Sequence, residues 1–338
     1  QLKPVIKIAV PMAGYGTRMR PHTWSKAKPL IALAGMTILD HVLEQFETLP
    51  DLLDREYVFI VGPNQLEQIK AHMQVSHPSK RVDYVVQEVM RGQSDALHLA
   101  REHLPGPLLM AFCDTVIETD LSQIAEEQAD GLAWVRTVED PRRFGVAQLD
   151  SDGWVTRLIE KPAEMDNKLA VVGFYYFKRG EDLVAAIEEQ MSRNVTVKNE
   201  FFLTDAINIM LEKGAKMRTR EVDVWLDAGI PEALLETNRH LLSHGYDNSL
   251  EINPEGDIAI IPPVYIHPTA EINAAVIGPY VSVGRNCVIE RVVISNSILE
   301  DGVSVSDSVL TGSILGRDVQ VEGKAENLNL GDNAWMKK

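Results

Sequence analysis

A six-residue apolar repeat near the C-terminus constrains the fold of this chain more than any other feature. The repeat is clearest at Ile266, Ile272, Ile277, Val283 and Ile289. Its register slips near residues 290–298, and looser copies follow at Ile298, Val303, Val309, Ile314 and Val321. Such a repeat, with small or polar residues between its members, is typical of a parallel β-helix whose aliphatic side chains stack inside the coils. We therefore expect a hexapeptide-repeat β-helix over residues 264–338, with a β-sandwich of short strands as the alternative.

The first two thirds of the chain alternate short apolar runs with amphipathic segments. The runs expected to be strands are residues 5–10, 57–61, 83–86 and 108–112, and the segments expected to be helices are 37–49, 65–74 and 94–103. This alternation predicts a Rossmann-like, mostly parallel α/β sheet with helices on both faces. Strands at 131–138, 145–149, 155–160 and 171–177 suggest a mixed-sheet insertion, and helices follow at 181–193, 203–213 and 231–243. Ligands of such sheets bind beyond the carboxyl ends of the strands.

A stretch rich in turn residues separates the two patterns. Residues 244–263 contain three prolines and two glycines, which break regular structure. We therefore predict a domain that carries the chemistry at residues 1–243, a linker at 244–263 and the β-helix at 264–338.

Composition limits the classes of function. The 338 residues, 45% of them hydrophobic, can bury the cores of two domains. A net charge of −16 argues against a nucleic-acid binder, so an anionic ligand must meet a local basic cluster. Two cysteines, Cys113 and Cys287, have no metal-ligand spacing, which predicts neither a disulfide framework nor a zinc site. With no apolar run long enough to cross a membrane, a cytoplasmic location is expected.

One local basic cluster follows the first predicted strand. Residues 11–30 read PMAGYGTRMRPHTWSKAKPL, in which Gly14 and Gly16 allow a close backbone approach to a ligand and Arg18 and Lys28 supply positive charge. The third glycine of a dinucleotide fingerprint would fall at Met19, and no Gly-Lys-Ser/Thr of a P-loop occurs. The stretch therefore predicts a phosphate-binding loop of another kind.

This loop resembles the sugar nucleotidylyltransferases, which make nucleoside-diphosphate sugars. The family pattern, roughly G-x-G-T-R-x-x-P-x-T-x-x-x-P-K, is matched by Gly14, Gly16, Thr17, Arg18, Pro21, Thr23 and Lys28. The chain departs from it at Ala27, where proline is usual, and at Met36-Thr37, where a Lys-Pro pair is common. Three later segments extend the resemblance: QEVMRGQSDAL from Gln87, Glu160-Lys161-Pro162, and Trp225-Leu226-Asp227-Ala228-Gly229.

The resemblance implies a role for each of these segments. The residues implied in nucleotide binding are Ala13, Gly14, Gly16, Thr17, Gln87 and Gly92, and those implied in sugar-phosphate binding are Gly145, Glu160, Lys161, Gly173, Tyr175 and Glu200. Arg18, Lys28 and Lys161 are the implied catalytic residues. Asp114, which follows Cys113 where the family usually has glycine, and Asp227 would hold Mg²⁺.

The implied reaction joins a sugar 1-phosphate to a nucleoside triphosphate and releases pyrophosphate. A glutamine amide at Gln87 suits the edge of uracil or thymine, so dTTP or UTP with glucose 1-phosphate is the first choice and GTP with mannose 1-phosphate the second. The partners are these two small molecules, without nucleic acid or membrane, and the β-helix is expected to stabilise the other domain or to build a homo-oligomer.

Several alternatives stay open or are set aside. A non-catalytic regulatory homologue would be expected to lack Arg18, Lys28 or one aspartate of the metal pair, and all are present. Acyltransferase activity in the β-helix lacks an obvious catalytic histidine, because His267 sits at the first coil. Ser94 and His98 share one helix without a third partner, and His41, His72, His77 and His103 show no ligand spacing, so these histidines are interpreted as surface or helix residues.

Overall fold

The chain folds into two compact units. The computed structural model describes residues 2–324, 328–329 and 331–336. One unit contains residues 1–31 and 37–230, and the other contains residues 32–36 and 231–338. The helix α6 (Pro231–Leu241), placed by the sequence with the first domain, thus groups with the second unit.

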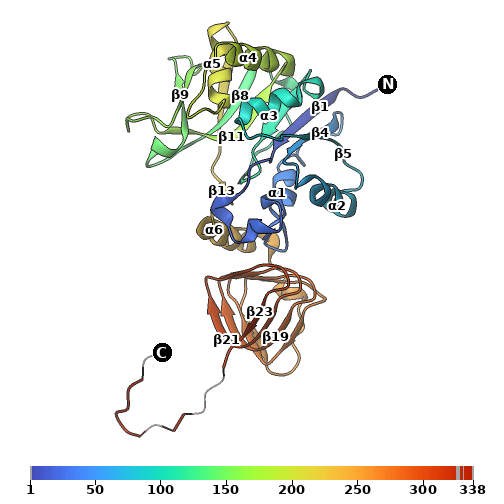
Figure 1. The fold of residues 1–338 in the computed structure, drawn as a ribbon, viewed down its shortest axis with the longest axis vertical. Helices are drawn as coiled ribbons and strands as arrows, with labels where there is room; N and C mark the ends of the chain where they lie inside the picture. Colours follow the sequence, from blue (N-terminus) through green and yellow to red (C-terminus); the bar gives the residue numbers. More distant parts are fainter. Residues whose placement is uncertain (1, 325–327, 330, 337–338) are drawn as a thin grey trace. The chain divides into compact units, whose positions relative to one another are not determined.

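A mixed sheet of nine strands forms the centre of the first unit, within the described residues (Figure 1). Its main order is β10-β9-β11-β6-β1-β4-β5, with β8 beside β11 and β12 beside β8. The strand β1 pairs in parallel with β4 and β6, whereas β11 runs antiparallel to β6, β8 and β9. The bounds are β1 (Val5–Pro11), β4 (Asp54–Val61), β5 (Arg81–Val86), β6 (Leu108–Ala111), β8 (Gly131–Thr137), β9 (Gly145–Leu149), β10 (Val155–Glu160), β11 (Leu169–Phe177) and β12 (Met217–Glu221). The predicted Rossmann-like sheet is confirmed.

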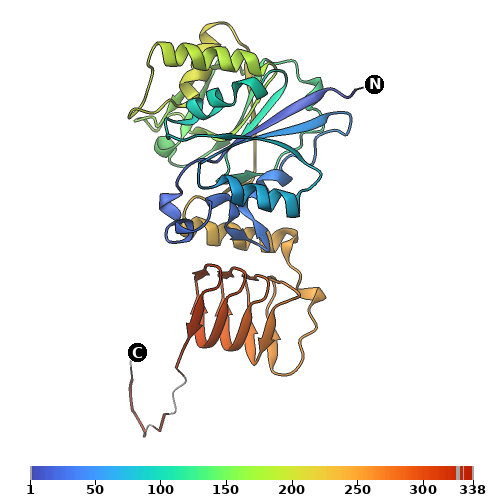
Figure 2. The ribbon, with the colours of Figure 1, turned by 45° about the vertical axis from the view of Figure 1, so that its right-hand side comes forward.

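The apolar runs of the sequence form the buried middle of this sheet. Every residue of β6 is buried, and so is the centre of β1, as expected for strands covered by helices on both faces. The helices are α1 (Ile38–Glu44), α2 (Leu66–Ser76), α3 (Gln93–Leu99), α4 (Gly180–Ser192) and α5 (Leu203–Glu212). Residues of β1, β4, β6, α3, α4 and α5 share one hydrophobic core, and α4 and α5 lie side by side in Figures 1 and 2.

Two predicted helices are shorter than expected. The segment predicted as 37–49 ends at Glu44 and continues as turns, in which Phe46 N–H donates to Leu43 O and Glu47 N–H donates to Glu44 O. The segment predicted as 94–103 ends at Leu99 and continues only as a 3₁₀ turn. The start of α1 is confirmed: Thr37 and Asp40 form a reciprocal capping box.

Three short strands of this unit were not predicted. They are β12, β7 (Thr115–Ile117) and β13 (Trp225–Asp227), and β7 and β13 pair with each other as a separate two-stranded sheet. Because β7 and β13 have three residues each, they show no measurable periodicity, and their pairing could not be predicted from the sequence.

In the second unit, short parallel strands stack as successive coils (Figure 2). The strands are β14 (Ile258–Ile260), β15 (Val264–Ile266), β16 (Glu271–Asn273), β17 (Ala275–Ile277), β18 (Val281–Val283), β19 (Val288–Ser295), β20 (Ser297–Leu299), β21 (Ser304–Thr311), β22 (Ile314–Leu315) and β23 (Gln320–Glu322). They are arranged as a parallel β-helix, which confirms that prediction. The first strand, β14, pairs with β17 although it lies within the predicted linker.

The coils are shorter than three hexapeptides. Val264 pairs with Val281, which pairs with Ser297, so one coil spans 17 residues and the next 16. The interior includes Ile277, Val283 and Ile289, as predicted. Val309 was wrongly assigned to the interior, because its side chain is 80% exposed.

The error at Val309 has a local cause. Asp307 has a left-handed φ of 50° inside β21, which changes the face that the following residues present. Arg291 has a φ of 54° at the equivalent place of the preceding coil, and Val293 beyond it is 47% exposed. A turn inside each of these strands thus explains the register slip near residue 290.

Candidate functional site

The glycine loop leaves β1 at Pro11 and closes on itself. Gly16 has a φ of 63°, and a Cβ at this position would lie 2.8 Å from Thr23 Cγ2. The Thr23 hydroxyl donates to Gly16 O at 2.7 Å. Thr17 and Arg18 follow directly and are exposed. A glycine is therefore needed at position 16 to hold the turn that presents these two side chains.

The start of α2 braces this loop through two glutamines that were not predicted: Gln65, which precedes the helix, and Gln68, which lies within it. Gln65 Nε2 donates to Gly14 O at 3.2 Å. Gln68 accepts from Ala27 N–H at 2.9 Å through Oε1 and donates to Ser25 O at 3.3 Å through Nε2. Both ends of the loop are thus tied to the start of α2. A sequence signal existed, since two glutamines three residues apart lie on one helix face.

The Gln68 contact accounts for the departure at Ala27. Ala27 has a φ of −63°, the value that a proline ring would impose. A proline has no N–H, whereas the Ala27 N–H is fixed by Gln68. The hydrogen bond therefore takes the place of the ring as the constraint on the backbone immediately before Lys28.

The β7–β13 pairing brings the two predicted metal-binding aspartates together. Asp227 is opposite Thr115 in the pairing, and Ala228 N–H donates to Asp114 O at 2.8 Å. A Cβ on Gly229 would lie 3.0 Å from Asp227 Oδ1, 3.7 Å from Asp114 Oδ2 and 3.5 Å from Arg18 Nη2. Two carboxylates and one guanidinium therefore converge beside Gly229.

Lys28 belongs to the same cluster. Its Nζ lies 3.2 Å from Asp114 Oδ2, and the side chains of Lys28 and Asp114 are 13% and 30% exposed. Burial is the largest single influence on the pKa of Lys28 and lowers it, but the charge and hydrogen bond of Asp114, together with Cys113, more than offset it, so the pKa lies above its ordinary value. Burial raises the pKa of Cys113 to about 11, so its thiol is neutral and does not compete for a cation.

The segment predicted to recognise the base is anchored inside the protein. Gln87 is 4% exposed, and its Nε2 donates to Gly92 O at 3.3 Å and to Asp95 Oδ2 at 3.0 Å. Gly92 has a φ of 107°, and a Cβ there would lie 2.6 Å from Phe201 N. Both amide hydrogens of Gln87 are thus used internally, and its carbonyl oxygen is the group left to meet a base.

A second acidic cluster lies at the end of β10. Glu160 is opposite Gly145 on β9, and a Cβ on Gly145 would lie 3.1 Å from Glu160 Oε2. Burial raises the pKa of Glu160 and of Asp205, and burial followed by the Glu160 charge raises that of Tyr175. Lys161, at a left-handed φ of 47°, has its Nζ 5.8 Å from the centre of the Phe202 ring.

Of the remaining predicted residues, Gly173 and Glu200 flank these clusters, and Ala13, just before Gly14, is buried. Gly173 has a φ of 84° at a bulge of β11, and a Cβ there would lie 2.5 Å from Phe112 Cδ2, so only glycine fits. Glu200 is exposed, and its backbone pairs with Val197 just before the segment that packs on Gly92.

The predicted residues thus form three groups within the first unit. Arg18, Lys28, Asp114 and Asp227 meet beside Gly229, Gln87 meets Gly92, and Gly145, Glu160 and Tyr175 surround the second acidic cluster. Asp95 and Asp205, which take part in the last two groups, were not singled out as ligands or partners in these roles. None of the helices in the described part of the chain is long and apolar enough to cross a membrane.

The chain is similar in sequence to known nucleotidyltransferases and similar in fold to a solved structure. A glucose-1-phosphate thymidylyltransferase of Streptomyces antibioticus is 29% identical, over 94% of this chain and 93% of its own length. A low-salt glycan biosynthesis nucleotidyltransferase of Haloferax volcanii is also 29% identical, over 96% and 98%. A crystal structure from Bacillus anthracis, described as a glucose-1-phosphate thymidylyltransferase in complex with a sucrose, has a TM-score of 0.60 at 21% identity and covers 74% of this chain and 98% of its own.

Two family models match the chain. Residues 260–332 match the GMPPB C-terminal domain. Residues 9–244, well over half of the chain, match the family described as Nucleotidyl transferase. The resemblance seen in the motifs is therefore confirmed, and the chain belongs to the nucleotidyl transferase family.

Proposed function

We propose that this enzyme joins a sugar 1-phosphate to a nucleoside triphosphate, giving a nucleoside-diphosphate sugar and pyrophosphate. The observation that carries the proposal is the cluster of Arg18, Lys28, Asp114 and Asp227 beside Gly229. Two cations and two carboxylates next to a glycine turn are the groups that binding a triphosphate requires. The family match and the relatives named above agree with this chemistry.

In this proposal the protein acts by positioning and by charge. An oxygen of the sugar phosphate attacks the α-phosphorus in line, and pyrophosphate leaves. Arg18 holds the pyrophosphate moiety, Lys28 the α-phosphate and Lys161 the phosphate of the sugar. No general base is needed, because the sugar phosphate is already an anionic nucleophile. The raised pKa of Lys28 keeps its ammonium charged at neutral pH.

A divalent metal ion fits this cluster. Enzymes of this family generally use one, and the carboxylate oxygens of Asp114 and Asp227 are hard ligands of the kind that Mg²⁺ prefers. We assign Mg²⁺ to these two residues; when bound, it neutralises charge on the phosphates. Lys28 already shields Asp114 by an ion pair, so Lys28 is placed to pass from the carboxylate to a phosphate oxygen as nucleotide binds.

Gln87 bears on the choice of base. With its amide hydrogens bound to Gly92 and Asp95, its carbonyl oxygen can accept a hydrogen bond from the N3–H of thymine or uracil. We therefore keep dTTP or UTP with glucose 1-phosphate as the first pair. The N1–H of guanine is also a donor, and the GMPPB domain match at residues 260–332 agrees with GTP and mannose 1-phosphate as the second pair.

The sugar is assigned to the second acidic cluster. Glu160 and Tyr175 offer polar groups in a partly dehydrated setting, where hydrogen bonds to sugar hydroxyls discriminate well. Gly145 lets β9 lie close to Glu160, Gly173 lets β11 pack on Phe112, and Glu200 belongs to the segment proposed to close over the sugar. A homo-oligomer built through the β-helix and a cytoplasmic location complete the proposal.

A pyrophosphate-release assay tests the proposal. The full-length protein with Mg²⁺ is offered dTTP, UTP, GTP, ATP and CTP, each with glucose, mannose, galactose and N-acetylglucosamine 1-phosphates. We expect one pair, most rapidly glucose 1-phosphate with dTTP or UTP, to release pyrophosphate only when both substrates are present. Silence across the matrix would refute catalysis and favour the regulatory homologue.

A further inference from the structure

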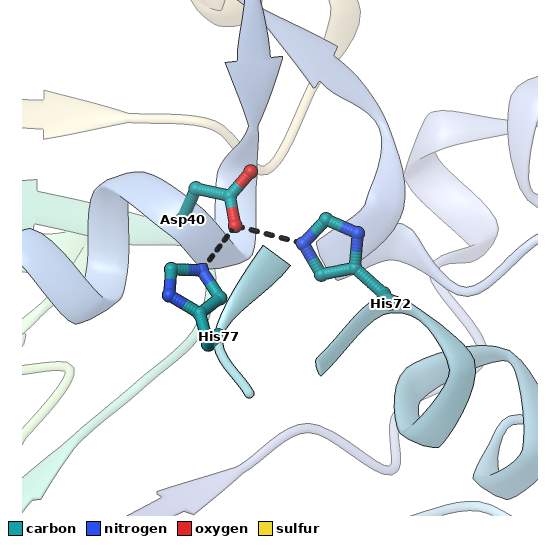
Figure 3. A group of neighbouring side chains, drawn as sticks. All are labelled: Asp40, His72 and His77. Atoms are coloured by element: carbon teal, nitrogen blue, oxygen red, sulfur yellow. Dashed lines mark hydrogen bonds and ion pairs between the residues drawn. The ribbon is translucent and has the colours of Figure 1, made fainter. Parts of the chain in front are cut away.

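A second group of potential metal ligands lies on and next to α1 and α2. It is separate from Arg18, Lys28, Asp114 and Asp227, which we call the triphosphate cluster. His72 Nε2 and His77 Nε2 each lie 2.7 Å from the same oxygen, Asp40 Oδ1 (Figure 3). His72 is on α2, His77 follows its last residue, and Asp40 is in the first turn of α1. Interpreting these histidines as surface or helix residues missed this convergence, because Asp40 is more than thirty positions away in the sequence.

The carboxylate is held so that one oxygen faces both imidazoles. Asp40 Oδ2 accepts from Thr37 N–H at 2.9 Å, and Asp40 N–H donates to Thr37 Oγ1 at 3.1 Å. The capping box therefore fixes the side chain and leaves Oδ1 for His72 and His77, as Figure 3 shows. The three side chains are 12%, 17% and 20% exposed for Asp40, His72 and His77. The cluster is sheltered but still in reach of solvent.

The donor set selects the kind of ion. Two imidazole nitrogens and one carboxylate oxygen suit zinc, whereas Mg²⁺ and Ca²⁺ prefer oxygen ligands throughout. One potential ligand atom from each of the three residues lies within 4.8 Å of the others. Around tetrahedral zinc, ligand atoms are about 3.3 Å apart, so each 2.7 Å contact would lengthen by only about 0.6 Å.

We propose that Asp40, His72 and His77 bind one zinc ion, with water in the fourth position. The carboxylate hydrogen bond from Thr37 orients the first ligand, as outer contacts do at known metal sites. This site is independent of the proposed nucleotidyl transfer, because none of its ligands belongs to the triphosphate or sugar clusters. The sequence predicted no zinc site because its two cysteines lack metal-ligand spacing, but the proposed site contains no cysteine.

The ion would stiffen the helix that supports the glycine loop. His72 lies one helical turn beyond Gln68, whose side chain holds Ala27 and Ser25. Zinc would join the far end of α2 to α1 by coordinate bonds in place of hydrogen bonds. Its role is therefore structural: it stabilises the frame on which the loop is built.

Zinc titration of the full-length, tag-free protein tests the site. The protein is treated with chelator and then titrated with Zn²⁺ in the presence of excess Mg²⁺, with free zinc read by a chromophoric chelator. We expect one equivalent to bind, the melting temperature to rise, and Co²⁺ in its place to give the intense visible bands of a tetrahedral site. An Asp114→Asn variant should bind the same equivalent, because its substitution lies in the triphosphate cluster.

Matched variants decide between coordination and hydrogen bonding. His72→Gln and His77→Gln should each abolish the zinc equivalent and the rise in melting temperature, whereas His103→Gln, which alters a partly exposed histidine near Asp83, should change neither. Absence of zinc binding in the wild-type protein, or retention of it in both cluster variants, would overturn the proposal. If the variants do not fold, an X-ray absorption spectrum of the zinc-loaded wild type decides: it should contain two imidazole ligands, and a spectrum without them refutes the site.

Discussion

The carboxylates of the triphosphate cluster and those of the second acidic cluster, the proposed sugar site, lie in opposite electrostatic surroundings. Asp114 has a cation at 3.2 Å, Lys28, and shares its surroundings with Arg18. Burial is the largest influence on the pKa of Glu160 and raises it; the Lys161 charge opposes this rise, and the Asp205 carboxylate adds to it. In the triphosphate cluster a nearby cation balances the carboxylate charge, whereas in the second acidic cluster burial disfavours the charged form of the carboxylate.

This difference predicts how each cluster responds to perturbation. Removing the Asp114 carboxylate would leave the largely buried Lys28 ammonium without its partner, so the triphosphate cluster is sensitive to removal of charge. A dehydrated carboxylate takes up a proton much more readily, so pH alone can alter what it binds. We therefore expect a substitution in the triphosphate cluster to lower turnover, and a change of pH to alter sugar binding by the second acidic cluster.

The largest expected effect comes from removing charge in the triphosphate cluster. Asp114→Asn should lower turnover by ~100-fold or more, the scale of losing one electrostatic contact in a transition state. The measurement is the rate of pyrophosphate release at saturating substrates and Mg²⁺. Asp152→Asn, an exposed residue in the β9–β10 turn, is the matched control and should leave turnover unchanged. Turnover near wild type in Asp114→Asn would remove this residue from the site.

A smaller effect, and one that depends on pH, is expected at Glu160. Burial raises the pKa of Glu160 above its ordinary value of 4.5. As pH falls from neutral into the weakly acid range, Glu160 becomes protonated before an exposed glutamate would, and hydrogen bonds that it accepts from sugar hydroxyls are lost. The KM for sugar 1-phosphate should therefore rise in that range. Glu160→Gln should raise KM about 10-fold at pH 7, as expected for one hydrogen bond to a charged group.

The Glu160→Gln variant also separates the enzyme's titration from that of the substrate. Protonation of the sugar phosphate affects both proteins equally, so the ratio of their KM values isolates Glu160. That ratio should approach one as pH falls; a ratio independent of pH would contradict the assignment. A raised carboxyl pKa stabilises the fold at low pH and loses that contribution as pH rises through it. The substitution should therefore not lower the melting temperature at pH 7.

The sequence predicted these clusters unevenly, for physical reasons. Arg18 and Lys28 were singled out because they place positive charge beside the glycines of the loop, whereas Asp114 and Asp227 were singled out through the resemblance of their segments to the family. The pairing of β7 with β13 that joins the two aspartates left none, since each strand has three residues. The cluster of Asp40, His72 and His77 was missed for a similar reason: it arises from contacts between side chains distant in the sequence, and no spacing within α1 or α2 indicates it.

The β-helix shows the same limit at the level of one residue. Its six-residue repeat predicted the architecture and the interior positions Ile277, Val283 and Ile289 correctly. The repeat cannot report a left-handed residue inside a strand, so Asp307 turned Val309 outward against expectation. Aliphatic periodicity records which residues are apolar, whereas the backbone decides which face each of them takes.

The smallest expected effects on activity come from substitutions in the loop that positions Lys28 in the triphosphate cluster. Gln68→Ala removes the acceptor of Ala27 N–H and the donor to Ser25 O, and should raise the KM for nucleoside triphosphate by roughly 3- to 10-fold. Ala27→Pro alone should be similarly harmful, because it removes a bonded N–H and leaves Gln68 Oε1 without that donor. Both effects are measured as KM with turnover recorded alongside.

The double variant Ala27→Pro with Gln68→Ala tests whether the hydrogen bond and a proline ring do the same work. Ala27 already has the φ of proline, so once Gln68 is truncated the ring should restore the backbone constraint at no steric cost. The two changes should therefore be strongly non-additive, with the double variant closer to wild type than Gln68→Ala. Additive losses would mean that Gln68 supports Lys28 chiefly through Ser25, and that the charge pair with Asp114 does not depend on the Ala27 backbone.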